Sequence, residues 1–314
     1  FVYGNEAEGV PGCIANGIDE KTANKIYDEM TDFAKYAFNK SHAAAYAVVS
    51  YQTAWLKYYY PVEYMAALMT SVIDNPGKVA EYIYSCRQMG IKILPPDINH
   101  GYSSFSVDNG SIRYGLAAIK SIGRPVIKEI VAERKANGEF KNLKDFIERM
   151  SGKDINKRTI ENFIKSGAFD ELGGTRKQFM VIYVQILDQV NREKKNSMTG
   201  QMSLFDIVGE EQKSEFDIPL PNVGEYEKST KLAFEKEVLG IYLSGHPMEE
   251  YEEQWRKGIS KTTQDFQFDE ELGFSRVSDG ATEIIGGIIA SKTIKYTKNN
   301  KTMCFLTIED IMGS

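Results

Sequence analysis

Near its start the chain contains the segment Phe38-Asn39-Lys40-Ser41-His42-Ala43-Ala44-Ala45-Tyr46-Ala47-Val48-Val49-Ser50-Tyr51-Gln52-Thr53-Ala54-Trp55-Leu56-Lys57-Tyr58-Tyr59-Tyr60-Pro61. We predict a helix over this segment, capped at its start by Asn39 or Ser41. Pro61 predicts its end, because proline disfavours helical geometry in the residue before it. Inside the segment, apolar residues at helical spacing predict a buried stripe, formed by Val48, Tyr51 or Gln52, Trp55 and Tyr59.

A second stripe at the same spacing is polar and consists of His42, Tyr46, Ser50, Thr53 and Lys57. One interpretation is an ordinary solvated helix face. The other is a surface that meets phosphates and a base, because Lys40 and His42 stand at the helix start, where free N–H groups also favour anions. Periodicity alone leaves both interpretations open.

Resemblance to a known family favours the second interpretation. The runs Phe38-Asn39-Lys40-Ser41-His42, Ala44-Ala45-Tyr46, Ser50-Tyr51-Gln52-Thr53-Ala54-Trp55-Leu56-Lys57 and Tyr60-Pro61 resemble the fingers region of the bacterial DNA polymerase III alpha subunits, in the DnaE-type branch of the C-family replicative polymerases. The fingers helices of that family face the incoming nucleoside triphosphate and the template. The resemblance therefore implies that Lys40, His42 and Tyr46 lie near the nucleotide or the DNA.

Composition sets broad limits on the kind of protein. The chain has 314 residues, 26% of them charged and 42% hydrophobic, which is typical of a soluble protein with more than one domain. It has neither an apolar run of membrane-spanning length nor a signal peptide, and it opens on Phe1, so we expect a piece of a longer protein without a membrane partner. The three cysteines are scattered and show no spacing for zinc or for a disulfide framework, so we expect a reducing, cytoplasmic setting.

Charge is unevenly distributed along the chain. The formal net charge is −6, which by itself argues against a nucleic-acid partner. Residues 113–177, however, contain 15 Lys and Arg against 9 Asp and Glu, whereas residues 206–271 contain 7 against 17. A basic block is therefore followed by an acidic one, and the basic block is the candidate for DNA contact.

The basic block has the pattern of a helix-hairpin-helix motif. Asp108-Asn109-Gly110 predicts a β-hairpin turn, and the run from Gly115 to Pro125 then predicts a short helix, a tight turn at Gly123 and a second helix. Small residues would let backbone N–H groups approach a phosphate, with Lys120 and Arg124 adding charge. A plain helical hairpin without DNA contact is the alternative.

A weaker second copy follows in the same block. Lys157 and Arg158 open a helix, a turn follows at Gly167, and Thr175 caps another helix that starts with Arg176 and Lys177. The family resemblance agrees, since its alpha subunits carry a tandem helix-hairpin-helix region directly after the fingers. That resemblance implies a grip on duplex DNA without sequence readout.

A short apolar motif follows a polar linker. Its residues, Gln201-Met202-Ser203-Leu204-Phe205, resemble the pentapeptide by which bacterial polymerases bind the sliding clamp. Apolar side chains in an exposed linker favour a partner, because nothing nearby would bury them. The alternative is that Leu204 and Phe205 fold back on their own domain.

The C-terminal part predicts a small helical region and then strands. His246 has no metal partners at ligand spacing, so we interpret it as structural. Residues 284–290 and 302–308 predict two strands around a basic turn, and this pattern resembles the start of an OB fold that contacts single-stranded template. A solvated hairpin tip is the alternative.

Together these observations predict a mainly α, multidomain chain: a helical fingers region at 1–100, a tandem helix-hairpin-helix domain at 101–195, a linker with the clamp motif at 196–222, a helical connection at 223–275 and the start of a β OB fold at 276–314. The resemblance implies template–primer DNA, deoxynucleoside triphosphates, the sliding clamp and other replicase subunits as partners. No cluster of metal-binding carboxylates is seen, so we expect no catalytic residue, metal or cofactor here. In the family, Mg²⁺ is bound by palm aspartates upstream of the fingers. A non-polymerase DNA-binding module and a clamp adaptor remain the alternatives.

Overall fold

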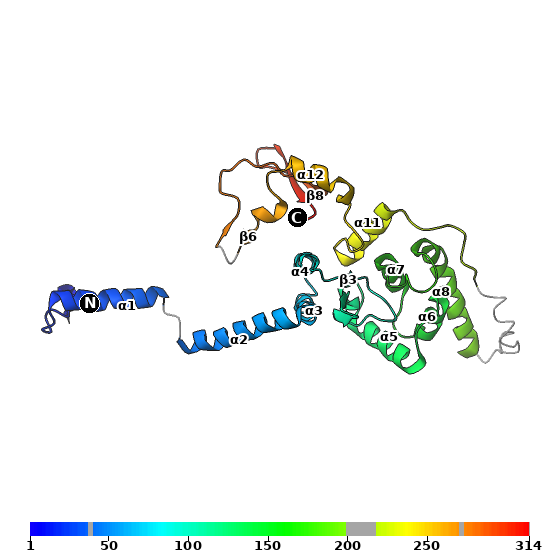
Figure 1. Cartoon of the computed structure of the whole chain (residues 1–314), viewed down its shortest axis with the longest axis horizontal. Coiled ribbons are helices and arrows are strands. Elements are labelled where there is room, and N and C mark those ends of the chain that lie inside the picture. Colours follow the sequence, from blue (N-terminus) through cyan, green and yellow to red (C-terminus); the bar gives the residue numbers. More distant parts are fainter. Residues whose placement is uncertain (37–39, 199–217, 270–272, 314) are drawn as a thin grey trace. The chain divides into compact units, whose positions relative to one another are not determined.

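The computed structural model of the chain describes residues 1–36, 40–198, 218–269 and 273–313 (Figure 1). Its contacts divide the chain into two compact units, Phe1–Tyr59 and Tyr60–Ser314. Helices dominate the described residues and strands gather toward the C-terminal end, so the expected mainly α architecture with a β end is confirmed.

The first unit is a small hairpin followed by two helices. Strands β1 (Gly4–Asn5) and β2 (Val10–Pro11) pair antiparallel around the 3₁₀ turn η1 (Glu6–Glu8). Helix α1 (Glu20–Tyr36) begins after Asp19, whose carboxylate accepts a hydrogen bond from the Thr22 N–H at 3.0 Å. Helix α2 (Lys40–Tyr59) ends two residues before Pro61, as that proline predicts.

The predicted buried stripe of α2 is wrong for this chain. The side chains of Val48, Tyr51, Trp55 and Tyr59 are 57%, 71%, 42% and 59% exposed. A helix buries its apolar face only against another element, and no described element of the first unit packs along α2. Ser41 lies inside the helix and is therefore not its N-cap, while Asn39, the other predicted cap, lies outside the described residues.

The second unit contains the remaining elements. Its helices are α3 (Pro61–Ser71), α4 (Pro76–Gln88), α5 (Arg124–Asn137), α6 (Leu143–Met150), α7 (Lys157–Ser166), α8 (Arg176–Met198), α11 (Lys228–Leu239) and α12 (Glu252–Gly258). Its 3₁₀ turns are η2 (Leu116–Ala118), η4 (Glu249–Tyr251) and η5 (Thr263–Phe266). Its strands are β3 (Ile93–Leu94), β4 (Ser106–Asp108), β5 (Ser111–Arg113), β6 (Phe268–Asp269), β7 (Phe274–Ser275), β8 (Ile288–Tyr296) and β9 (Thr302–Glu309).

Local signals place the ends of several of these elements. Asn75 caps α4 by accepting the Lys78 N–H at 3.2 Å, and Gly90 follows the helix in the left-handed conformation that glycine tolerates. The turn between β4 and β5 has positive φ at Asn109 and Gly110, 48° and 76°. Such a turn suits the twist of an antiparallel hairpin, so the predicted hairpin is confirmed.

One hydrophobic core joins α3, α4, the small sheet β3–β5–β4 and helices α5 to α8. Phe146 of α6 lies at its centre, with ring centroids 5.0 Å from Phe140, 6.1 Å from Phe163 and 4.9 Å from Phe169. Edge-to-face packing of this kind fixes the helices against one another. The hairpins that carry the predicted DNA contacts therefore stand on a rigid base.

The C-terminal strands β8 and β9 form a two-stranded antiparallel hairpin in which Ile288 faces Glu309. Strand β8 begins four residues later than the predicted strand at 284–290 and ends at Tyr296, so it includes only the first two residues of the basic turn expected at 295–301. Two strands alone do not distinguish an OB fold from another hairpin, so the OB fold stays a prediction.

Candidate nucleic-acid interface

The first predicted hairpin is a tight turn before α5. Its first arm is the three-residue 3₁₀ turn η2 rather than a full helix, and Ser121 turns the chain with a φ of 64°. Gly123 precedes α5, and no side chain caps the first turn of this helix. The N–H groups at the start of α5 therefore lack side-chain partners, which is the arrangement that binds a phosphate.

Gly123 is not required by the protein's own packing. Its φ is −76°, which any residue adopts, and a Cβ built there would have only Pro125 Cδ nearby, at 3.6 Å. The protein's own packing therefore does not explain why this residue is glycine. Close approach of an external group to the backbone would explain it.

The second hairpin presents two cations at the start of α7. Asn156 caps this helix by accepting the Thr159 N–H at 3.0 Å, and Lys157 and Arg158 follow in the first turn, both exposed. Lys157 pairs with Asp188 at 3.4 Å, but both partners are about half exposed. An exposed pair of this kind contributes little stability and can exchange for a phosphate.

The structure brings the two hairpins together in one hollow, which we call the basic groove. It is lined by Lys120, Lys157, Arg158, Glu161, Asn162, Glu237 and Val238. Three predicted DNA contacts from two separate parts of the sequence thus line the same hollow. Within the described residues, Lys120 and Arg158 form no ion pair that would neutralise their charge.

The main chain of Lys120 is held from both sides. Its N–H donates to the Val238 carbonyl at 2.8 Å, and its carbonyl accepts from the Asn162 amide at 2.7 Å. Asn162 is only 7% exposed and lies on α7 among buried apolar residues. Sequence reasoning missed this residue, although an asparagine on an apolar helix face is a signal that a buried polar partner is needed.

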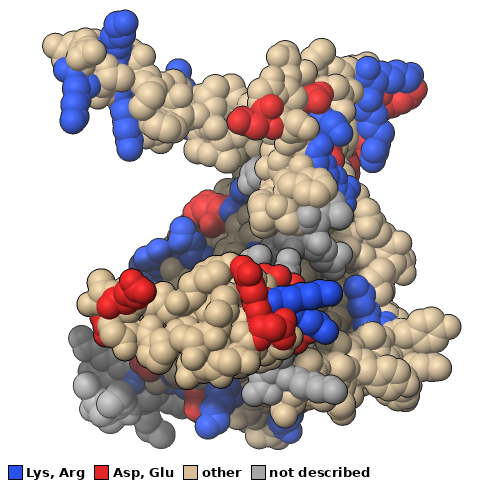
Figure 2. All heavy atoms as spheres, turned by 90° about the vertical axis from the view of Figure 1, so that its left-hand side faces the viewer, with Lys and Arg blue, Asp and Glu red and all other residues tan. Residues whose placement is uncertain are grey.

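Two acidic side chains also border the basic groove. Lys165 lies 2.8 Å from both Glu161 and Glu237, so these carboxylates share a cation of their own. Figure 2 shows basic atoms in separate clusters on the face it displays, interrupted by acidic and uncharged atoms. Positive charge is therefore concentrated locally, as in the basic groove, and does not form one continuous face on this side of the molecule (Figure 2).

Arg176 requires a correction. It was predicted to contact DNA, but it is only 3% exposed and donates to Asp170 at 2.8 Å and to Glu235 at 3.3 Å. Burial lowers the pKa of its guanidinium, and the hydrogen bonds and charges of these two carboxylates outweigh that effect and raise the pKa. Arg176 is an internal ion-pair partner, and we exclude it from the interface.

The remaining predicted contacts lie elsewhere. Arg124 is exposed at the start of α5, 3.9 Å from the carboxylate of Asp74. Lys177 is half-buried, with its ammonium 5.9 Å from the centre of the Tyr226 ring. In the first unit, the rings of His42 and Tyr46 lie 4.2 Å apart on one face of α2, and Lys40 is the first residue of that helix.

The predicted clamp motif has no described counterpart. Gln201, Met202, Ser203, Leu204 and Phe205 lie outside the described residues. The described part of the chain holds no group of three or more His, Cys, Asp or Glu that could bind a metal ion, so no Mg²⁺ site is assigned. None of the described helices combines the length and apolar character that a bilayer crossing requires.

One part of the chain matches a known motif family. Residues 90–179, which include β3 to α7 and the start of α8, match the helix-hairpin-helix motif family. This part of the chain is therefore a helix-hairpin-helix domain, and its match supports the hairpin pattern inferred from the sequence.

The whole chain is similar to one part of a particular polymerase subunit. It is 37% identical over 96% of its length to the DNA polymerase III subunit alpha of Borreliella burgdorferi and 38% identical over 96% to that of Vibrio cholerae. The alpha subunit of Mycobacterium tuberculosis is 37% identical over 99% of the chain. These matches confirm the resemblance inferred from the sequence. The chain spans about a quarter of the length of these relatives.

Proposed function

We propose that this chain is the part of a DNA polymerase III alpha subunit that holds duplex template–primer DNA by its backbone. The observation that carries the proposal is the basic groove, where Lys120 meets Lys157 and Arg158 on a rigid core. Phosphate contacts position a protein on DNA without reading its sequence. The groove therefore supports binding that is strong at low salt and indifferent to sequence.

The test measures the binding of duplex DNA to the 314-residue chain by fluorescence anisotropy at several salt concentrations. We expect the double variant Lys120→Ala, Arg158→Ala to bind less tightly and to lower the slope of log K against log salt by roughly one to two. The matched control is Arg256→Ala, Lys257→Ala, which removes the same charges from α12, where both residues pair with glutamates of their own helix. Equal slopes for the double variant and this control would contradict the proposal.

Gly123→Ala separates DNA contact from folding. The new methyl group meets only Pro125 Cδ at 3.6 Å inside the protein, so we expect an unchanged free energy of unfolding. A phosphate that approaches the start of α5 would be held away, so duplex affinity should fall. Unchanged affinity would mean that this turn does not contact the DNA backbone.

For the first unit we propose that α2 faces the incoming nucleotide in the whole protein. The aromatic pair His42 and Tyr46 and the position of Lys40 at the helix start support this role. In the complete polymerase, Lys40→Ala and His42→Ala should raise the KM for deoxynucleoside triphosphate, because each removes a donor near the triphosphate. Steady-state primer extension with unchanged KM in both variants would contradict it.

We further propose that the segment Gln201 to Phe205 binds the sliding clamp and that DNA synthesis belongs to the whole polymerase. The support for the first is the motif itself in a polar linker. The support for the second is the similarity to subunits about four times as long. Primer extension by the chain alone should give no product, and extension above background would contradict this part of the proposal.

A further inference from the structure

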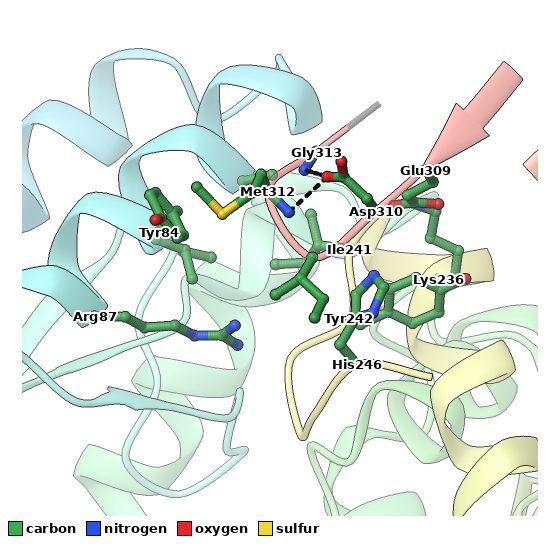
Figure 3. Close-up of a pocket in the computed structure, with 13 residues that line it drawn as sticks. Tyr84, Arg87, Lys236, Ile241, Tyr242, His246, Glu309, Asp310, Met312 and Gly313 are labelled. Atoms are coloured by element: carbon green, nitrogen blue, oxygen red, sulfur yellow. Dashed lines mark hydrogen bonds and ion pairs between the residues drawn. The ribbon is translucent and has the colours of Figure 1, made fainter. Parts of the chain in front are cut away.

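A second cavity lies apart from the basic groove, where α4, the loop after α11 and the end of β9 meet (Figure 3). We call it the α4–β9 cavity. Its volume is about 80 Å³, enough for a few waters or one small tetrahedral group but too small for a nucleoside. The polar residues that line it are Tyr84, Arg87, Lys236, Tyr242, His246, Glu309 and Asp310.

His246 brings an unused hydrogen-bond donor to this cavity. The ring is 8% exposed, and its Nδ1 accepts the Met248 N–H at 3.1 Å. Burial lowers the pKa of the imidazole, so the ring is neutral and its proton lies on Nε2. Among the described residues, Nε2 is the one buried side-chain nitrogen or oxygen without a hydrogen-bond partner.

Arg87 brings positive charge from the opposite side. It extends from the last turn of α4 toward the middle of the cavity, whereas His246 and Tyr242 lie across from it (Figure 3). The guanidinium forms no ion pair with any residue in the described ranges. Glu249 pairs with Lys228 and accepts a hydrogen bond from the His246 N–H. Of the effects that lower the pKa of Glu249, the charge of Arg87 is the smallest.

The other charged side chains that line the cavity already have partners within the protein. Lys236 pairs with Glu309 and lies 4.9 Å from the centre of the Tyr242 ring. Asp310 accepts from the Thr263 N–H and hydroxyl at 2.7 and 2.8 Å, and from the N–H groups of Met312 and Gly313 at 2.8 and 3.1 Å. Among the described residues that line the cavity, Arg87 is then the cation without an ion pair, and His246 Nε2 is the buried nitrogen without a hydrogen-bond partner.

Arg87 and His246 lie on opposite sides of the cavity (Figure 3), so a ligand that bonds to both needs acceptor oxygens that point in different directions. A phosphate group has this geometry, and it forms strong charge-assisted hydrogen bonds with an arginine. We propose that the α4–β9 cavity binds a single phosphate group, with Arg87 neutralising its charge and His246 Nε2–H donating a hydrogen bond. The proposal does not rest on the basic groove or on duplex binding.

The test uses inorganic phosphate and the full chain labelled with ¹⁵N. The chain has 3 histidines, so the imidazole signals of His246 can be assigned by comparison with His246→Phe. Phosphate should shift the Nε2–H signal of His246 and leave those of His42 and His100 in place. Absence of this shift at every phosphate concentration that the protein tolerates would overturn the proposal.

A charge variant keeps the test independent of folding around the buried histidine. Arg87 is exposed on α4, so Arg87→Gln should fold normally and weaken phosphate binding at least about tenfold. Arg192→Gln removes an exposed arginine from α8 and should leave the affinity unchanged. Equal effects of the two substitutions would overturn the assignment.

A second arm identifies the source of the phosphate. A short single-stranded oligothymidylate is titrated in place of inorganic phosphate, with the same His246 signal as readout. A shift that inorganic phosphate competes away supports a phosphodiester of nucleic acid as the ligand. A shift with inorganic phosphate alone supports a free phosphate, and the duplex-binding variants of the basic groove should change neither result.

Discussion

At the scale of single residues, Arg176 shows how a charged side chain serves the fold instead of a ligand. Its guanidinium links the start of α8 to Asp170, to the Lys165 carbonyl at the end of α7 and to Glu235 of α11. Glu235 is 1% exposed and also accepts the N–H groups of Leu243 and Ser244, both at 2.9 Å. The carboxylate therefore depends on Arg176 for the neutralisation of its charge.

Arg176→Met should lower the free energy of unfolding of the second unit by about 3–5 kcal/mol, because it leaves the buried Glu235 carboxylate without a cation. Urea unfolding followed by circular dichroism measures the change. Lys177→Met, one residue along the same helix, is the matched control and should change stability by less than about 0.5 kcal/mol. Similar losses in the two variants would show that Arg176 has no special structural role.

At the scale of elements, Glu133 ties α5 to α6 and to the turn that follows it. Its carboxylate accepts from Lys153 at 2.5 Å, from Asn137 at 2.7 Å and from Arg149 at 3.3 Å. The hydrogen bond from Lys153 is the largest of the causes that lower the pKa of Glu133 from 4.5 to about 2. Arg149 in turn donates to the Gly138 carbonyl, which closes the end of α5.

A lowered carboxyl pKa stabilises the folded state above the ordinary pKa, and this contribution is lost as the pH falls toward the folded value. The unfolding free energy should therefore decrease between pH 4.5 and about pH 2 through Glu133. Glu133→Gln should remove on the order of 1 kcal/mol of this acid dependence, measured by urea unfolding at several pH values. Glu129→Gln, an exposed position of the same helix, should retain it, and a Glu133→Gln curve parallel to wild type would contradict the assignment.

Elements whose ends depend on neighbouring residues could be predicted from the sequence. Pro61 and the Asn109-Gly110 turn act over a few residues, and each is found where the sequence predicts it. The environment of Arg176 could not be predicted, because Glu235 is 59 residues away in the chain. The prediction of a buried stripe on α2 was wrong for a related reason. Periodicity shows which face of a helix is apolar, but not whether another element is present to cover it.

For the candidate DNA interface too, the local features could be predicted from the sequence and the long-range ones could not. The basic character of residues 113–177 and both hairpins were visible in the sequence, because charge and turn residues are local properties. The meeting of Lys120 with Lys157 and Arg158 was not, since it depends on how α7 packs against the loop before α5 and on Asn162 in particular.

At the scale of the whole molecule, basic and acidic residues occupy successive parts of the sequence, and the proposed clamp motif lies between them. A linker placed there can reach a partner without unfolding either part. A peptide of residues 195–210 should therefore bind the purified clamp by itself, with the micromolar affinity typical of segments that become ordered on binding.

Leu204→Ala with Phe205→Ala in that peptide should weaken clamp binding about a hundredfold, close to 3 kcal/mol, because both apolar anchors are lost. Isothermal titration of the clamp gives both affinities. Ser203→Ala, directly before the two anchors, is the control and should have little effect. If the double variant binds as tightly as the wild-type peptide, Leu204 and Phe205 are not anchors for the clamp.

The Lys120 N–H donates to the Val238 carbonyl, and Arg176 pairs with Glu235. The part of the fold that carries the basic groove is therefore discontinuous in sequence. A fragment that ends with α8 would leave Arg176 without one of its carboxylates and the Lys120 N–H without its acceptor. A protease cut between α8 and α11, by contrast, would leave two pieces that remain associated through these contacts. Truncation at α8 should therefore damage DNA binding more than a nick in the intervening peptide.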